Sequence, residues 1–307
     1  MQRKTNLIWA STHILGRNKR YIFWFYLLNL AFAAAGGISF SRSTHRILDH
    51  SLYADRLLQG FDLAVLEEMI ARPEFGPVGS SALPALMGAL LFFLASLWFM
   101  PGVLLGYSSD HPISREEFFR ACGRNVWRLV RLCVVFALIA GFLTGSLSGI
   151  PGAVANALDK YSNDDRLLVL LECATLGLVV LLLTALRICF DLGETDVVLR
   201  DQPAVRKSMR WALRTTRRYS LSLLGSYLVA AIAAGVILLA GILLWHALVP
   251  PSSVLGAFLV SQATLVLLLV SRFWQRAIAV AFYLRIATLP ETESSSIPIR
   301  LSAASAP

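Results

Sequence analysis

Apolar residues form six long, continuous runs along the chain. They cover residues 21–40, 82–107, 129–149, 167–190, 221–249 and 254–271. A helix needs about 20 apolar residues to cross the hydrocarbon core of a bilayer, and each run approaches or exceeds that length. The runs lack the alternation of a membrane-spanning strand, so they favour helices. The pattern predicts an all-α, polytopic membrane helical bundle with about six transmembrane helices plus amphipathic interfacial helices.

The segments between the runs alternate in charge. The segments before residue 21 and at 108–128 and 191–218 are basic, whereas residues 41–81 and the connection near residues 159–165 are acidic. Basic segments stay in the cytoplasm. We therefore expect a multi-pass protein of the cell inner (plasma) membrane with both termini cytoplasmic. Residues 1–290 are predicted to form a single transmembrane domain, and residues 291–307, rich in Ser, Ala and Pro, a disordered cytoplasmic tail.

A cleavable signal segment is the alternative interpretation of residues 21–40. A basic leader precedes this run, and the small residues Ala31 and Ala33 lie within it. The apolar stretch continues to Phe40, however, and the leader is long for a signal segment. These features favour a membrane span.

Composition excludes an ordinary soluble domain. Hydrophobic residues make up 56% of the chain and charged residues only 15%, whereas soluble domains have about a quarter charged. The net charge of +9 lies mainly on the predicted cytoplasmic segments, so it favours anionic lipid as a partner over nucleic acid. The four cysteines lie in or beside the apolar runs, which argues against a disulfide framework.

Residues 203–218 are predicted to form a basic helix at the level of the lipid headgroups, because basic and apolar residues alternate there with helical spacing. Docking of a protein partner is the alternative. The basic residues assigned to headgroup contact are Arg206, Lys207, Arg210, Arg214, Arg217 and Arg218.

A threefold repeat is a further hypothesis. Residues 15–21, 122–128 and 213–219 resemble one another, and each leads into an odd-numbered apolar run. The repeating unit would be a short cytoplasmic helix followed by a membrane hairpin. The alternative is that any cytoplasmic end of a membrane helix collects arginine and aromatic residues. Ser114 and Glu117 also have the spacing of a capping box at a helix start.

Three groups of residues are candidates for a site or a packing surface. Glu172 lies inside the fourth run, where a carboxylate is costly unless paired, protonated or hydrated. It is the intramembrane polar candidate, with a structural acid near the outer interface as the alternative. The histidine and aspartate side chains at 45, 49 and 50 do not make a convincing metal site. Glycines spaced by four predict close helix packing within the chain or in a dimer, at Gly141, Gly145 and Gly149.

After the sixth run, the chain is apolar again at residues 277–284, behind Arg272 and Arg276. Arginines and tryptophan at such a boundary anchor a helix at the membrane surface. We therefore expect residues after 271 to continue as an interfacial helix.

One resemblance rests on Asp191, on residues 196–201, on the basic helix that follows, and on the sequence Ala-Phe-Tyr-Leu at 281–284. In these features the chain resembles uncharacterised six-helix bacterial membrane proteins, which are similar to the membrane domain of glycerophosphodiester phosphodiesterases. The likeness covers mainly residues 170–288. The chain lacks the His and Glu patterns of the phosphodiesterase domain, so the resemblance implies no catalytic residue.

No catalytic, metal or cofactor motif is recognisable in the sequence. We therefore expect a non-enzymatic bacterial inner-membrane protein that serves membrane organisation or is accessory to a partner complex. A small permease that uses Glu172 is the alternative, and a protein partner or a homo-oligomer stays open. An intramembrane lipid enzyme would need paired polar residues at one membrane depth, which the sequence does not reveal.

Overall fold

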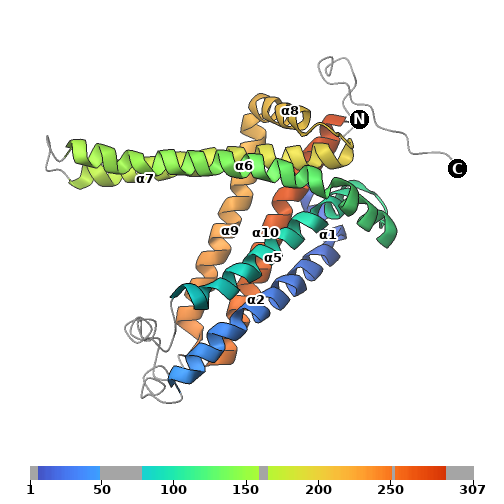
Figure 1. The fold of residues 1–307 in the computed structure, drawn as a ribbon. Helices are drawn as coiled ribbons and strands as arrows, with labels where there is room; N and C mark the ends of the chain where they lie inside the picture. Colours follow the sequence, from blue (N-terminus) through green and yellow to red (C-terminus); the bar gives the residue numbers. More distant parts are fainter. Residues whose placement is uncertain (1–5, 49–77, 159–164, 251–252, 288–307) are drawn as a thin grey trace. The chain divides into compact units, whose positions relative to one another are not determined.

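The computed structural model describes residues 6–48, 78–158, 165–250 and 253–287, and its regular elements in these ranges are α-helices (Figure 1). Six of them contain segments long and apolar enough to cross a membrane: α2, α5, α6, α7, α9 and α10. The predicted all-α membrane bundle with six transmembrane helices is confirmed. In chain order the helices are α1 (Leu7–Arg17), α2 (Lys19–Leu48), α5 (Val78–Ser108), α6 (Arg115–Leu158), α7 (Asp165–Leu199), α8 (Val205–Arg218), α9 (Ser220–Leu248) and α10 (Val254–Ala287).

Large apolar side chains cover the outward faces of the long helices. Leu138 and Phe142 of α6 are 70% and 74% exposed, and Leu176 of α7 is 65% exposed. Soluble proteins rarely expose continuous apolar surface of this kind, because water makes it unfavourable. Lipid hydrocarbon is the environment in which these faces are stable.

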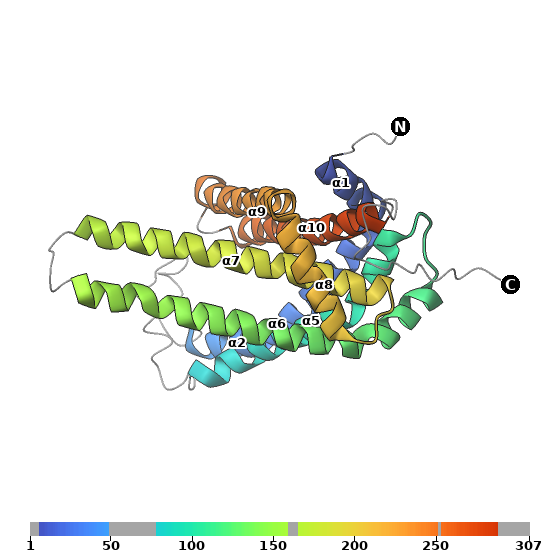
Figure 2. The ribbon, with the colours of Figure 1, turned by 90° about the horizontal axis from the view of Figure 1, so that it is seen from above.

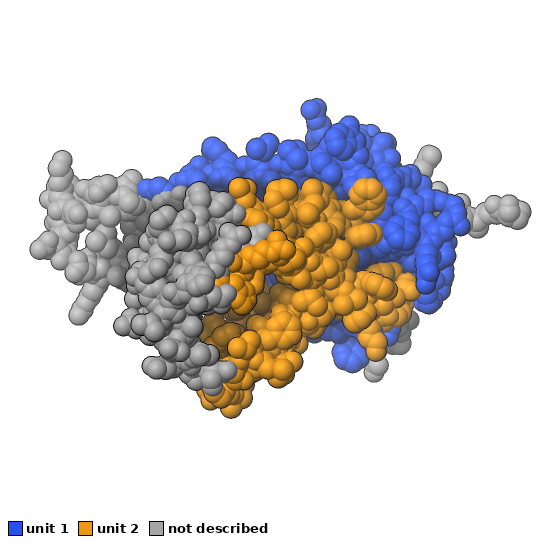
Figure 3. Space-filling view, turned by 60° about the horizontal axis from the view of Figure 1, so that its bottom comes forward, with its two compact units in different colours: residues 1–16, 100–230, 274–307 blue, residues 17–99, 231–273 orange. Residues whose placement is uncertain are grey.

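The chain divides into two compact units (Figure 3). Unit 1 contains residues 1–16, 100–230 and 274–307, and unit 2 contains residues 17–99 and 231–273. Helices α5, α9 and α10 each contribute one part to each unit.

In unit 1, five helices contribute side chains to a shared hydrophobic cluster. Leu7 of α1, Leu192 of α7, Ala212 of α8, Leu223 of α9 and Ile278 of α10 are all buried in it. Helices α6 and α7 run side by side in both ribbon views (Figures 1 and 2).

In unit 2, α2 packs against α5 and α10. The ring of Phe25 lies 6.4 Å from that of Phe99 and 5.0 Å from that of Phe273. The hydroxyl of Tyr26 donates a hydrogen bond of 3.1 Å to Oε1 of Gln262. The first apolar run is therefore an integrated helix of this unit in the structure.

Helices α7 and α10 extend well beyond the C-terminal boundaries expected from the sequence. Helix α7 continues from the fourth run to Leu199, and α10 continues unbroken to Ala287. The expectation that residues after 271 form an interfacial helix is wrong, because residues 277–283 of α10 are buried in unit 1. A helix segment that is apolar on all sides belongs in a protein interior, whereas an interfacial helix needs one polar side.

The proposed repeat has an uneven counterpart in the structure. Asn18 separates α1 from α2, and Tyr219 separates α8 from α9, so two short helices precede a long one as expected. The third expected short helix is instead the first part of α6, which runs without interruption from Arg115. The capping box at its start is confirmed. The amide of Ser114 donates to Oε2 of Glu117 at 2.9 Å, and the amide of Glu117 donates to Oγ of Ser114 at 3.2 Å.

Candidate functional site

The last turns of α7 bring three carboxylates into the interior of unit 1. Asp191, Glu194 and Asp196 are each 1% exposed. The side chains between and around them are apolar, and Leu192 and Val197 are completely buried. Burying a carboxylate is costly unless cations and hydrogen-bond donors compensate its charge. The partners of these three carboxylates therefore determine whether their burial is stable.

Asp191 has a cation and a hydroxyl as partners. The guanidinium of Arg187, one turn earlier on α7, approaches its carboxylate to 3.2 Å. The hydroxyl of Tyr227 on α9 donates a hydrogen bond of 3.0 Å to Oδ2. Tyr227 thus adds a hydrogen bond from α9 to this carboxylate on α7.

Glu194 and Asp196 have partners on α10 and at Arg200, the residue that follows the end of α7. Nε of Arg276 lies 3.7 Å from Oε2 of Glu194. Arg200 lies 3.6 Å from Asp196, and the hydroxyl of Tyr283 donates a hydrogen bond of 3.3 Å to the same carboxylate. The ring of Trp211 on α8 stacks edge-on against Tyr283, with centroids 5.3 Å apart.

We call these six charged residues the α7 charge cluster: Arg187, Asp191, Glu194, Asp196, Arg200 and Arg276. Three carboxylates face three guanidiniums, so the cluster has no formal net charge. Its direct contacts join α7 to α9 and α10. A network of buried charges that joins helices requires such compensation.

The turn between α7 and α8 carries a separate ion cluster. Nε of Arg124 donates to Oδ1 of Asp201 at 2.9 Å, and Nη1 of Arg128 donates to the same oxygen at 2.6 Å. Hydrogen bonds from Arg124 and Arg128 hold the pKa of Asp201 below its ordinary value of 3.8. Asp201 has a φ of 53°, a left-handed conformation that Asp tolerates better than most residues. These contacts join the turn before α8 to the first part of α6.

Helix α8 has one face that packs against the rest of unit 1 and one face that is basic. Small side chains form the packed face, where Ser208, Ala212 and Thr215 are buried. Cys189 of α7 lies 3.4 Å from the hydroxyl of Thr216, which extends this contact. The basic side chains are all exposed, and among the described residues none of them has an acidic partner: Arg206, Lys207, Arg210, Arg214, Arg217 and Arg218.

The basic helix at residues 203–218 was predictable from its sequence, and its helical state is confirmed. Beside the basic residues, the apolar side chain of Leu213 is 62% exposed. An exposed leucine among cations is suited to contact with the boundary between headgroups and acyl chains.

The other candidates from the sequence do not join either cluster. Glu172 lies in α7, but its side chain is outside the described residues. The same holds for the pair at residues 49–50, while His45 is exposed on α2. No group of three metal-ligating side chains occurs in the described part of the chain.

The glycines of α6 lie on an open surface. Within the described residues, a Cβ at Gly141, Gly145 or Gly149 would meet no atom of a neighbouring element within 4 Å. The expected close packing within the chain is therefore not seen in the described ranges. The close approaches occur elsewhere, for example at Gly102, where a Cβ would overlap the ring of Phe118.

The length of the apolar runs does not predict the α7 charge cluster. The fourth run ends at residue 190, so Asp191, Glu194 and Asp196 fall in the connection that is expected to be cytoplasmic. A signal was present in the sequence. Arg187 and Asp191, like Asp196 and Arg200, are spaced by four residues, so each pair can interact on one side of a continuing helix.

Comparison of the chain with protein-family models, curated proteins and solved structures gives no match. The resemblance to the membrane domain of glycerophosphodiester phosphodiesterases therefore stays a prediction.

Proposed function

We propose that this chain is a non-enzymatic protein of the bacterial inner membrane that binds anionic lipid at the cytoplasmic face through α8. In this role it would organise the surrounding lipid or support a partner complex. The observation that carries the proposal is the basic face of α8. Six cationic side chains are exposed on a helix whose opposite face is packed against its own unit.

The rigid seating of α8 supports a binding role for these cations. A flexible basic segment also attracts anionic lipid, but it must be ordered when it binds. Here Ser208, Ala212 and Thr215 are already buried, and the turn at Asp201 is held by two arginines. The basic face is thus preorganised, and little ordering entropy opposes the contact with phosphate groups.

The expected preference of α8 for anionic lipid follows from the number of its exposed cationic side chains. A basic residue near an anionic membrane surface contributes about 1 kcal/mol of binding free energy. Neutralising three of them should therefore weaken the preference for anionic lipid roughly a hundredfold, since each 1.4 kcal/mol changes an affinity about tenfold. Added salt should weaken it as well, because these side chains are exposed.

The test compares the full chain with a variant that carries Arg210→Gln, Arg214→Gln and Arg217→Gln. Each protein is purified in mild detergent and titrated with phosphatidylglycerol or phosphatidylcholine, and bound lipid is measured by native mass spectrometry. The wild type should prefer phosphatidylglycerol, and the glutamine variant should lose most of this preference.

The matched control replaces the same three residues with lysine. Because lysine keeps the charge, this variant should retain most of the preference if attraction to the charged headgroup is the cause. All three proteins should show the same elution volume and unfolding temperature before lipid binding is compared. An unchanged preference in the folded glutamine variant would refute lipid binding by α8.

A further inference from the structure

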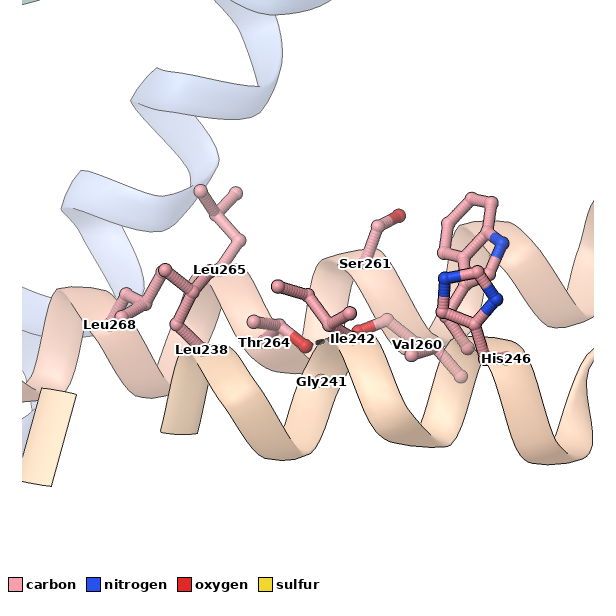
Figure 4. Close-up of a pocket in the computed structure, with 10 residues that line it drawn as sticks. Leu238, Gly241, Ile242, His246, Val260, Ser261, Thr264, Leu265 and Leu268 are labelled. Atoms are coloured by element: carbon pink, nitrogen blue, oxygen red, sulfur yellow. Dashed lines mark hydrogen bonds between the residues drawn. The ribbon is translucent and has the colours of Figure 1, made fainter. Parts of the chain in front are cut away.

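A groove lies between α9 and α10 within unit 2. It has a volume of about 380 Å³, and apolar side chains form most of its wall (Figure 4). Its lining residues fall between 238 and 268, so both walls belong to the last two transmembrane helices.

The floor of the groove is a close contact between the two helices. A Cβ at Gly241 of α9 would overlap the side chain of Thr264 on α10. The hydroxyl of Thr264 donates a hydrogen bond of 2.8 Å to the carbonyl of Val260, which holds the threonine in its rotamer. Gly241 therefore lets the helix backbones approach, and the larger side chains on either side enclose the groove.

The two ends of the groove differ in polarity. Leu238, Leu265 and Leu268 line one end, and His246 lies at the other (Figure 4). Trp245 lies next to His246 on α9 and also lines the groove. Both residues are within one turn of the end of α9 at Leu248. Aromatic rings with a polar atom are favoured at headgroup level, whereas leucine is favoured deeper in the hydrocarbon.

The surroundings of the groove determine what can enter it. Leu239 and Leu243 of α9 are 57% and 58% exposed, and Phe258 and Leu259 of α10 are 52% and 57% exposed. In helices that cross a membrane, these side chains border lipid hydrocarbon. Water is excluded at that depth, so an apolar groove open to this side is filled by a hydrocarbon chain.

We propose that the groove between α9 and α10 binds one acyl chain of a bilayer phospholipid. The methylene chain lies against the leucine end. The headgroup side of the lipid lies at Trp245 and His246, whose ring N–H groups can donate to ester or phosphate oxygens. This site is in unit 2 and needs no charge on α8, so it is independent of the proposed headgroup contact.

The first experiment fills the groove. Ser261 lines the groove and is exposed, so Ser261→Phe places a ring in the space of the acyl chain. Ala263, two residues along α10, is exposed but does not line the groove, and Ala263→Phe is the matched control. Each full-length protein is delipidated in detergent and titrated with phosphatidylcholine, which carries no net charge, and bound lipid is counted by native mass spectrometry.

The wild type and Ala263→Phe should each retain one phospholipid at low lipid concentration, and Ser261→Phe should bind it at least tenfold more weakly. Equal retention by Ser261→Phe and Ala263→Phe would overturn the proposal. Dimerisation of the wild type that Ser261→Phe abolishes, with no change in lipid retention, would also overturn it, because a second copy would then occupy the groove.

A second measurement does not depend on the folding of Ser261→Phe. Phosphatidylcholine with brominated acyl chains quenches tryptophan on contact. The contribution of Trp245 is the difference between the wild type and Trp245→Phe. That of Trp98, which is 53% exposed on α5, is obtained in the same way from Trp98→Phe. Trp245 should be quenched at a severalfold lower mole fraction of brominated lipid than Trp98. Equal dependence on mole fraction would show bulk lipid contact only and would overturn the proposal.

Discussion

Among single residues, the carboxylates of α7 are almost completely buried in the described structure. Glu194 is 1% exposed, and its cationic partner Arg276 comes from α10. The pair is separated by 3.7 Å, so the attraction is mainly between charges, without a short hydrogen bond. A buried ion pair adds little stability compared with a well-packed apolar pair, but removing one partner leaves an uncompensated charge.

Arg276→Met should therefore destabilise the protein strongly. Methionine keeps much of the side-chain volume, so the main change is the loss of the cation that faces Glu194. We expect a loss of about 3–5 kcal/mol in the free energy of unfolding. Thermal unfolding of the full chain in detergent measures this effect.

The double variant Arg276→Met with Glu194→Gln supplies the control for volume. It removes both charges, so it should recover much of the lost stability. Arg187→Met should cost less than Arg276→Met, because the side chain of Arg187 is 36% exposed and Tyr227 still donates to Asp191. If the double variant is no more stable than Arg276→Met alone, the loss comes from packing and not from the unpaired carboxylate.

At the scale of helices, the three segments proposed as repeats share one feature. Aligning residues 15–21, 122–128 and 213–219 places Asn18, Asn125 and Thr216 at the same position. All three are polar and buried, with exposures of 6%, 4% and 8%. A buried polar side chain at the same position is consistent with the proposed repeat. In α6, however, the short helix is fused to the long one.

Contacts between helices also determine which glycines are needed for the stability of the fold. Gly241 lets α9 approach α10, whereas Gly141 on α6 faces open space. Gly241→Ala should cost about 1–3 kcal/mol because the new methyl group overlaps Thr264. Gly141→Ala should gain about 0.5–1 kcal/mol, since alanine favours the helix. Unfolding temperatures of the two variants in the same detergent compare these effects.

Thr264→Ala tests the cause of the loss at Gly241. It removes the two side-chain atoms that the new methyl group would overlap most closely, so it should restore part of the stability of Gly241→Ala. Similar unfolding temperatures for Gly241→Ala and Gly141→Ala would contradict the close contact between α9 and α10.

At the scale of the whole molecule, the orientation in the membrane is a prediction from charge. Reporter fusions truncated after Asp110, Asp201 or Thr288 should all report a cytoplasmic location, because basic segments precede or contain each of these points. Fusions after Asp62 or Pro251 should report the opposite side. Green fluorescent protein and alkaline phosphatase, which are active on opposite sides of the membrane, provide the two readouts. An external location at any of the first three sites would refute the proposed topology.

The sequence by itself determined the fold class, the number of membrane helices and the basic helix at residues 203–218. These properties depend on the length of apolar runs and on spacing along one helix, which neighbouring residues specify. It also predicted the capping box of Ser114 and Glu117, since both residues belong to one helical turn.

Only the tertiary structure decided where the carboxylates of α7 lie. Tyr227 follows Asp191 by 36 residues, and Tyr283 follows Asp196 by 87, so no local pattern reveals that these side chains meet. Hydropathy along the chain places the end of an apolar run at the first charged residues. In the structure, partners from other helices compensate these charges, so the helix continues with them buried. The groove between α9 and α10 has the same origin. Gly241 and Thr264 create it together, and the packing of two helices brings them into contact.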